Sequence, residues 1–67
     1  MNTQDYVWLT QNSYIFNNVR LQPEDLRMII DIYNRVTGDN MRMTGCARCI
    51  QNIKKRLRTE YDRYQDL

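Results

Sequence analysis

The residues best suited to chemistry in this chain of 67 residues are two cysteines, Cys46 and Cys49. A thiol in the first turn of a helix has a lowered pKa because the nearby amides stabilise the thiolate. Such a pair can be a redox site, but the strands that flank a thioredoxin-like Cys-x-x-Cys helix are not predicted here. It can also supply two ligands to zinc, in which case a symmetric dimer would have to provide four thiols. We expect a third role, two small core side chains, because both cysteines share an apolar stripe with Ile50 and Ile53.

The composition offers few side chains suited to acid and base catalysis. The chain contains no histidine, the side chain that most often transfers protons near neutral pH. Glu24 and Asp25 are adjacent carboxylates, but they lie where a helix N-terminus favours negative charge. The sequence has no glycine-rich phosphate loop. We therefore predict that the protein is not an enzyme and uses no cofactor or small-molecule substrate.

Basic residues are concentrated in one part of the chain. The net charge is only +2, yet residues 42–58 contain six basic residues and no acid. On a helix these side chains spread around the polar face, which suits a solvated surface or an acidic protein groove as well as a duplex. Nucleic-acid binding is therefore the alternative function, with these candidate contacts: Arg42, Arg48, Lys54, Lys55 and Arg58.

Apolar and aromatic side chains exceed what three helical stripes would bury. The chain has seven aromatic residues, and aromatic residues are enriched at interface hot spots. Within residues 23–37, two side chains beside the main arc widen it to roughly 200°, whereas a stripe of about 100° is enough to face one core. This surplus predicts contact with a protein partner or a second copy of the chain. The candidate contacts are Met28, Ile32, Tyr6, Tyr14, Tyr61 and Tyr64.

Two helices are marked by local signals. Pro23 and the two acids after it are typical of a helix start, and Gly38 is typical of a left-handed C-terminal cap, so a helix is predicted over residues 23–37. Thr44 is a good N-cap residue, and the apolar periodicity that follows predicts a long helix over residues 44–65.

The beginning of the chain is ambiguous. Residues 4–18 fit either a helix or a β-hairpin that turns at Gln11-Asn12-Ser13. The helix is favoured because an isolated hairpin is marginally stable. Five apolar side chains then fall on one arc: Trp8, Leu9, Ile15, Phe16 and Val19. The expected fold is a single all-α domain over residues 1–67, a small bundle of three helices.

The length of the chain makes a partner a reasonable expectation. A domain of this size buries only about 60% of the surface that its unfolded chain exposes, and natural domains below about 70 residues usually gain stability from a disulfide, a metal or a partner. No apolar run approaches the ~18 residues that span a membrane. The first residues also lack the charged and apolar regions of a secretory signal. We therefore expect no membrane association and reduced cysteines.

One part of the chain resembles a known group of proteins. The resemblance is to small uncharacterised helical proteins encoded by tailed phages of Bacteroidetes, and it covers residues 30–57. It is carried by three stretches: Ile32-Tyr33-Asn34-Arg35-Val36-Thr37-Gly38, Thr44-Gly45-Cys46 and Cys49-Ile50. It implies a phage protein that serves as a virion or assembly component or inhibits a host-defence complex, in the host cytoplasm or the virion. It transfers no functional residue. The leading interpretation is a helical module that docks on a protein assembly or self-associates.

Overall fold

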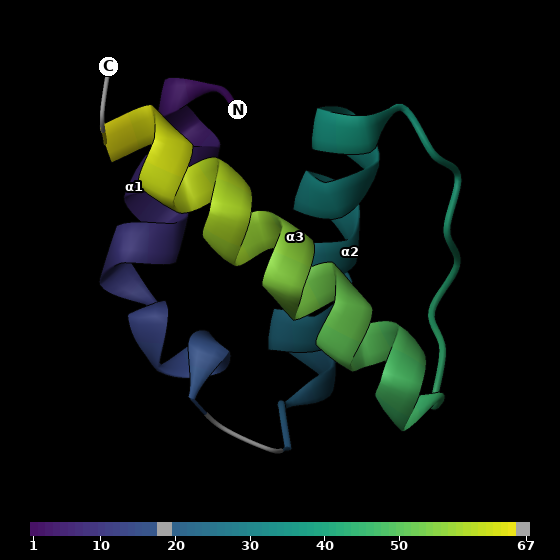
Figure 1. Cartoon of the computed structure of the whole chain (residues 1–67). Helices are drawn as coiled ribbons and strands as arrows, with labels where there is room; N and C mark the ends of the chain where they lie inside the picture. The colour runs from purple at the N-terminus through teal and green to yellow at the C-terminus, as the bar shows by residue number, and fades with distance from the viewer. Residues whose placement is uncertain (18–19, 66–67) are drawn as a thin grey trace.

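The computed structural model describes residues 1–17 and 20–65, which form three α-helices and one short 3-10 helix (Figure 1). The elements are α1 (Thr3–Gln11), η1 (Ser13–Phe16), α2 (Pro23–Thr37) and α3 (Ala47–Gln65). Within these described ranges no strand occurs, so the predicted all-α fold is confirmed and the hairpin alternative is not adopted. None of the described helices is long and apolar enough to cross a membrane.

Helix α1 is shorter than the helix predicted over residues 4–18. It starts at the N-cap Asn2, whose Oδ1 accepts from the Asp5 backbone N–H at 2.7 Å. It ends at Gln11 because both the backbone N–H and the side-chain amide of Asn12 donate to the Trp8 carbonyl, at 2.9 and 2.8 Å. An asparagine that bonds to the backbone in this way competes with helix continuation. The chain then tightens into η1. Residue 18, the last of the predicted helix, and Val19, which was assigned to its apolar arc, lie outside the described residues.

Helix α2 has the bounds that its terminal signals predicted. Pro23 occupies the first turn, and two acids follow it. At the other end Gly38 has φ 80°, and its N–H donates to the Asn34 carbonyl at 2.8 Å. This left-handed conformation is inexpensive only for glycine, so the residue fixes the end of the helix.

Helix α3 begins at Ala47, three residues later than predicted. The Thr44 hydroxyl is not the helix cap, because it accepts from the Cys46 backbone N–H at 3.0 Å in a local turn. The Cys46 carbonyl accepts the first helical bond, from the Ile50 N–H at 3.0 Å. Cys46 is therefore the N-cap residue of α3.

The core lies where α3 crosses both α1 and α2 (Figure 1). Helix α2 contributes three buried isoleucines, among them Ile32, which is 0% exposed. Its wide apolar arc is thus explained by a central position in the fold, and the prediction that Ile32 contacts a partner is wrong. The buried apolar side chains are Leu9, Ile15, Ile29, Ile30, Ile32, Ile53, Leu57 and Tyr61.

Tyrosines join the two ends of the described chain, which lie side by side in Figure 1. The ring of Tyr6 on α1 stacks on Tyr61 with centroids 4.9 Å apart and tilts against Tyr64 at 4.3 Å. The Tyr61 hydroxyl lies 2.8 Å from that of Thr10, and the Tyr64 hydroxyl lies 3.0 Å from that of Thr3. The last turns of α3 therefore pack directly against α1.

Candidate functional site

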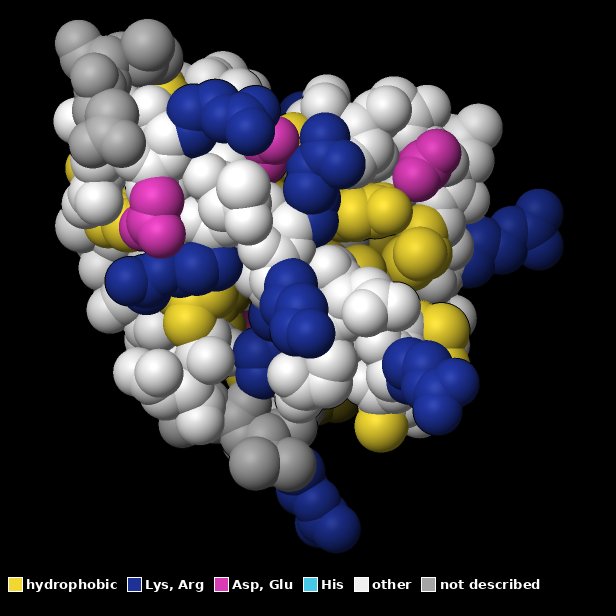
Figure 2. All heavy atoms as spheres, in the orientation of Figure 1, with side chains coloured by type: hydrophobic (Ala, Val, Ile, Leu, Met, Phe, Trp, Pro, Cys, Tyr) yellow, Lys and Arg dark blue, Asp and Glu magenta, His cyan; other side chains and the backbone are white. Residues whose placement is uncertain are grey.

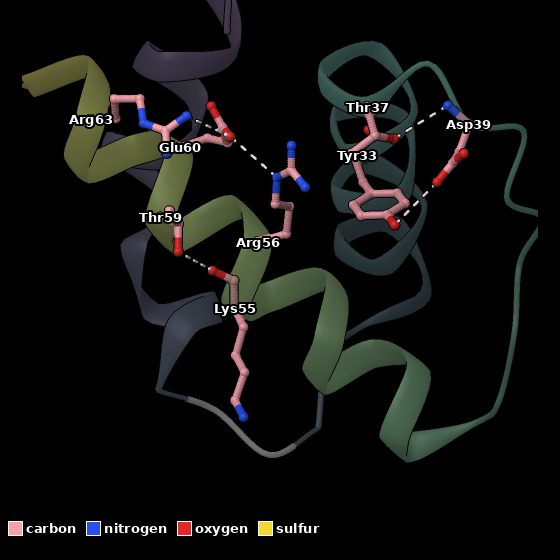
Figure 3. A network of polar contacts seen from close by, with 8 residues as sticks. All are labelled: Tyr33, Thr37, Asp39, Lys55, Arg56, Thr59, Glu60 and Arg63. Carbon is pink, nitrogen blue, oxygen red and sulfur yellow. Dashed lines mark hydrogen bonds and ion pairs between the residues drawn. The ribbon is translucent and has the colours of Figure 1, made fainter.

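The segment between α2 and α3 has no regular secondary structure, but side-chain hydrogen bonds attach it to α2. The side-chain amide of Asn34 donates to the Met41 carbonyl at 3.0 Å and accepts from the Met41 N–H at 2.9 Å. Closer to α2, Asp39 accepts from the Tyr33 hydroxyl at 3.2 Å and its own N–H donates to the Thr37 hydroxyl (Figure 3). These bonds fix the path by which the chain reaches the start of α3.

Both cysteines lie at the surface at the beginning of α3. Cys46 is exposed and Cys49 is half-buried, so the prediction that they form part of the core is wrong. They do share a stripe with Ile53, but the buried part of α3 begins only at Ile53, beyond the first turn of the helix. The Cys49 N–H donates to Cys46 Sγ at 3.2 Å. The Cys46 sulfur thus takes the place of the side-chain oxygen that usually caps a helix.

The two thiols differ in acidity because each acts on the other. The hydrogen bond from the Cys49 side chain lowers the pKa of the Cys46 thiol, and the backbone amides of Cys49 and Arg48 lower it further. The same side-chain contact raises the pKa of Cys49, as do partial desolvation and the charge of Cys46. The negative charge therefore favours Cys46, the exposed sulfur, and the proton stays on Cys49.

An apolar hollow of about 380 Å³, here called the leucine hollow, lies between the beginnings of α2 and α3, and chain neighbours of the two cysteines are among its lining residues. Leu21 and Leu26 occupy the positions before the N-cap and in the first turn of α2 that typically form a hydrophobic staple. They therefore stay together at the surface and leave an apolar wall. The lining residues are Arg20, Leu21, Leu26, Gly45, Ala47, Ile50 and Gln51. Sequence reasoning missed this hollow, although the spacing of the two leucines around Pro23 was a signal for it.

The described residues do not complete a metal site. In residues 1–17 and 20–65, no group of three or more His, Cys, Asp or Glu side chains is placed to hold an ion. Cys46 and Cys49 are thus two donors without a third of these types in that part of the chain. A four-ligand zinc site would still require a second copy.

Three of the five predicted nucleic-acid contacts meet at a second hollow of about 320 Å³, here called the basic hollow. It is lined by Phe16, Asn17, Gln51, Lys54, Lys55 and Arg58. The Arg58 guanidinium lies over the Phe16 ring, 5.3 Å from its centroid, while Lys54 is only 5% exposed. The other two candidates, Arg42 and Arg48, are exposed but do not line this hollow.

The charge of α3 differs between its two halves. In the second half Glu60 lies between Arg56 at 3.2 Å and Arg63 at 3.5 Å (Figure 3), and Asp62 pairs with Arg58 at 3.4 Å. The first half has no acid. Figure 2 shows the face of the molecule that carries α3. Lys and Arg side chains project over much of this surface, and carboxylates are visible at only a few points.

The predicted partner-binding residues do not form a single surface. Ile32 and Tyr61 belong to the core, and the rings of Tyr6 and Tyr64 are in tilted contact where α1 meets the last turns of α3. Met28 is half-buried against the core. Tyr14 is 43% exposed, and its hydroxyl donates to Asp25 Oδ2 at 2.6 Å. Most of the expected apolar surplus is therefore internal.

No protein-family model, curated protein or solved structure matches this chain. Its function must be argued from its own geometry. The features that the fold does not explain, namely two surface thiols, an apolar hollow and basic residues without acids, meet at the start of α3. We regard that end of the molecule as the candidate functional site.

Proposed function

We propose that the protein is a non-enzymatic docking module whose leucine hollow receives an apolar side chain from an acidic segment of a partner protein. The observation that carries this proposal is the hollow itself, which is walled by Leu21, Leu26 and Ile50 and has Arg20 in its lining. Interface anchors typically fill such pockets and are surrounded by polar contacts that exclude water.

Burial supports an apolar occupant. Leu21, Leu26 and Ile50 are half-buried, so each retains apolar surface that faces the hollow. Covering this surface would gain about 25 cal/mol for each Å² removed from water. The volume of about 380 Å³ is sufficient for one large side chain and part of the adjoining backbone.

Charge complementarity supports an acidic partner. Arg20 lines the hollow, and the six basic residues of the acid-free stretch 42–58 include Arg48 beside it in the chain. Charges at the rim of an interface mainly steer association and suppress like-charged partners. If the chain is phage-encoded, as the resemblance of residues 30–57 implies, we propose a virion, assembly or host-defence protein as the partner, in the host cytoplasm or the virion.

A site-specific photo-crosslinker tests this proposal. Gln51 lines both hollows, so a benzoylphenylalanine at this position in the full chain would report what binds to either. We expect a protein adduct whose crosslinked peptide is acidic and contains a large apolar residue. A crosslinker at Val7, which is 46% exposed on α1, is the control position and should give no such adduct.

A variant with a negative charge in the lining of the leucine hollow tests whether the adduct depends on that hollow. Ala47 is the first residue of α3 and is exposed, so Ala47→Asp adds an acid where a helix start favours one and should fold. We expect it to lower the yield of the protein adduct several-fold. Gln4→Asp makes the same change of charge in the first turn of α1 and should leave the yield unchanged. Equal yields from these two variants would contradict docking at the leucine hollow.

The basic hollow supports nucleic-acid binding as a second candidate function. Lys55 and Arg58 are exposed there, and the planar Arg58 guanidinium, which lies over the Phe16 ring, offers a face on which a base can stack. The test is fluorescence anisotropy of labelled single-stranded and duplex DNA over a salt series. Removing one bond to a phosphate should reduce the slope of log affinity against log salt by about 0.7–0.9. Lys55→Gln with Arg58→Gln should flatten the slope, whereas Arg56→Gln with Arg63→Gln should have less effect.

A further inference from the structure

We propose that Cys46 and Cys49 form a reactive dithiol that undergoes thiol–disulfide exchange with an accessible disulfide and ends as an intramolecular disulfide at the start of α3. The carrying observation is an exposed sulfur at the helix cap that accepts a hydrogen bond from the backbone N–H of Cys49, the residue that bears the second, half-buried thiol. This inference goes beyond the docking function and does not depend on it.

The spacing of the two residues is suited to a disulfide. Residues three positions apart at a helix start have Cα atoms about 5 Å apart, within the span of roughly 4.4–6.8 Å that disulfides cover. The Cys49 N–H already holds Cys46 Sγ at 3.2 Å, and the Thr44 hydroxyl accepts from the Cys46 N–H at 3.0 Å. The first bond keeps the Cys46 sulfur turned toward Cys49 and the second restrains the Cys46 backbone, so little movement is needed to join the sulfurs.

Exposure gives the two thiols different parts in the reaction. Cys46 is exposed and can meet a disulfide from solution, whereas Cys49 is half-buried beside it. The surroundings are electropositive, because the acid-free stretch 42–58 includes Arg48 between the two cysteines. The lowered pKa of Cys46 and the raised pKa of Cys49 agree with an attacking thiolate and a thiol that reacts second.

The reaction balances with a disulfide as the oxidant. The Cys46 thiolate attacks one sulfur of the incoming disulfide, so that a mixed disulfide forms at Cys46 and the other half leaves as a thiolate. Cys49 then loses its proton to solvent and attacks the Cys46 sulfur. The bond between Cys46 and the first half breaks, that half leaves as a second thiolate, and the Cys46–Cys49 disulfide remains. The two protein thiols are oxidised, and the incoming disulfide is reduced to two thiols.

A thiol pair of this kind can also bind a soft metal ion, but the structure favours disulfide formation. The disulfide needs only these two sulfurs, and the Cys49 backbone N–H already holds the Cys46 sulfur close to Cys49. Among the described residues no third His, Cys, Asp or Glu side chain joins Cys46 and Cys49 to complete a metal site. Metal binding is therefore an outcome that the experiment must be able to detect.

The experiment uses the reduced full chain with oxidised glutathione as the disulfide, near neutral pH, in parallel samples with and without a chelator. Intact mass spectrometry of acid-quenched samples should show the loss of two hydrogens in the wild-type chain and little glutathione adduct. In Cys49→Ser the mixed disulfide at Cys46 should accumulate because the second step is blocked. Cys46→Ser keeps a good N-cap residue and should fold, yet its Cys49 should react roughly tenfold more slowly than the Cys46 of Cys49→Ser. Circular dichroism confirms that both variants are folded.

Three results would overturn the proposal. The first is a wild-type chain that carries glutathione on both cysteines without closing a disulfide. The second is an equal rate of adduct formation in the two serine variants, since that would show that the cysteines have no separate roles. The third is purified protein whose thiols react only after a chelator removes a bound metal, which would assign the pair to metal binding instead.

Discussion

The Asp5 carboxylate on α1 accepts two hydrogen bonds from the Arg35 guanidinium on α2, at 2.7 Å from Nη2 and 3.0 Å from Nε. Asp5 is only 3% exposed, whereas the Arg35 side chain is 48% exposed. A buried carboxylate is costly unless its charge is matched, and a bidentate arginine matches it in both charge and geometry. This pair is therefore the main polar connection between the described parts of α1 and α2.

Loss of this pair should weaken the fold. We expect Arg35→Gln to lower the free energy of unfolding by about 1.5–3 kcal/mol, the usual range for a hydrogen bond to a charged group. Urea denaturation followed by circular dichroism measures the change. Arg27→Gln removes an exposed arginine from the same helix and should stay within about 0.5 kcal/mol of the wild type. Equal effects from the two variants would show that the ion pair contributes nothing of its own.

Ile32 provides a test of the central position of α2. Because its side chain is 0% exposed, Ile32→Ala should destabilise the protein by about 2–5 kcal/mol through reduced burial and a residual cavity. Met28→Ala, at a half-buried position on the same helix, should cost clearly less. Thermal unfolding of the two variants side by side makes the comparison, and a smaller loss at Ile32 than at Met28 would contradict the buried placement.

The two glycines should respond to alanine in opposite ways. Gly38 has φ +80°, so Gly38→Ala should cost about 1–2 kcal/mol even though no atom lies within 4 Å of the added Cβ. Gly45 also has open space around it but no positive φ. Gly45→Ala should therefore stabilise the protein by about 0.4–1 kcal/mol, because it restricts the unfolded chain. Urea midpoints at constant m-value distinguish the two, and changes of the same sign would argue against the assigned C-cap.

Tyr14 should give the protein an alkaline pH dependence. Its hydrogen bond to Asp25 raises the pKa of Tyr14, ahead of desolvation and the charges of Asp25 and Glu24. The folded-state pKa then lies above the unfolded-state pKa, so the contact stabilises the fold below the unfolded-state pKa. That stabilisation is lost as the pH rises through the folded-state pKa.

An absorbance titration of tyrosinate measures this shift. The difference between the wild-type and Tyr14→Phe curves isolates Tyr14, and Asp25→Asn should move its titration to lower pH. The same difference curve measured in concentrated urea gives the pKa of Tyr14 in the unfolded state. A Tyr14 curve that is unchanged by Asp25→Asn would mean that the hydrogen bond does not control its ionisation.

The fold was predictable where the signals were local. Pro23 and Gly38 fix α2 because a missing N–H and a left-handed conformation act on the backbone directly. The C-terminal end of α1 and the start of α3 were missed for a related reason. Asn12 and Thr44 each have side chains that bond to nearby backbone groups, and periodicity does not show whether such a residue starts, ends or lies outside a helix.

The candidate site was less predictable because it depends on which elements face one another. Cys46 and Cys49 lie on the same stripe as Ile53 and Leu57, but no periodic pattern tells where the opposite wall of the core ends. Ile32 presented the reverse case. Its position beside the main arc suggested the surface, whereas burial of a wide sector of α2 by α1, η1 and α3 could be seen only in three dimensions.

The contact of Tyr6 with Tyr61 and Tyr64 has a consequence for the order in which the protein can fold. During synthesis α1 leaves the ribosome first, but the rings that it stacks against belong to the last turns of α3. Contacts between segments so distant in sequence form late, because the intervening chain must first be ordered. A nascent chain that stops before Tyr61 would therefore present Tyr6 and Leu9 to chaperones and proteases, and the complete packing of α1 would await the synthesis of the last turns of α3.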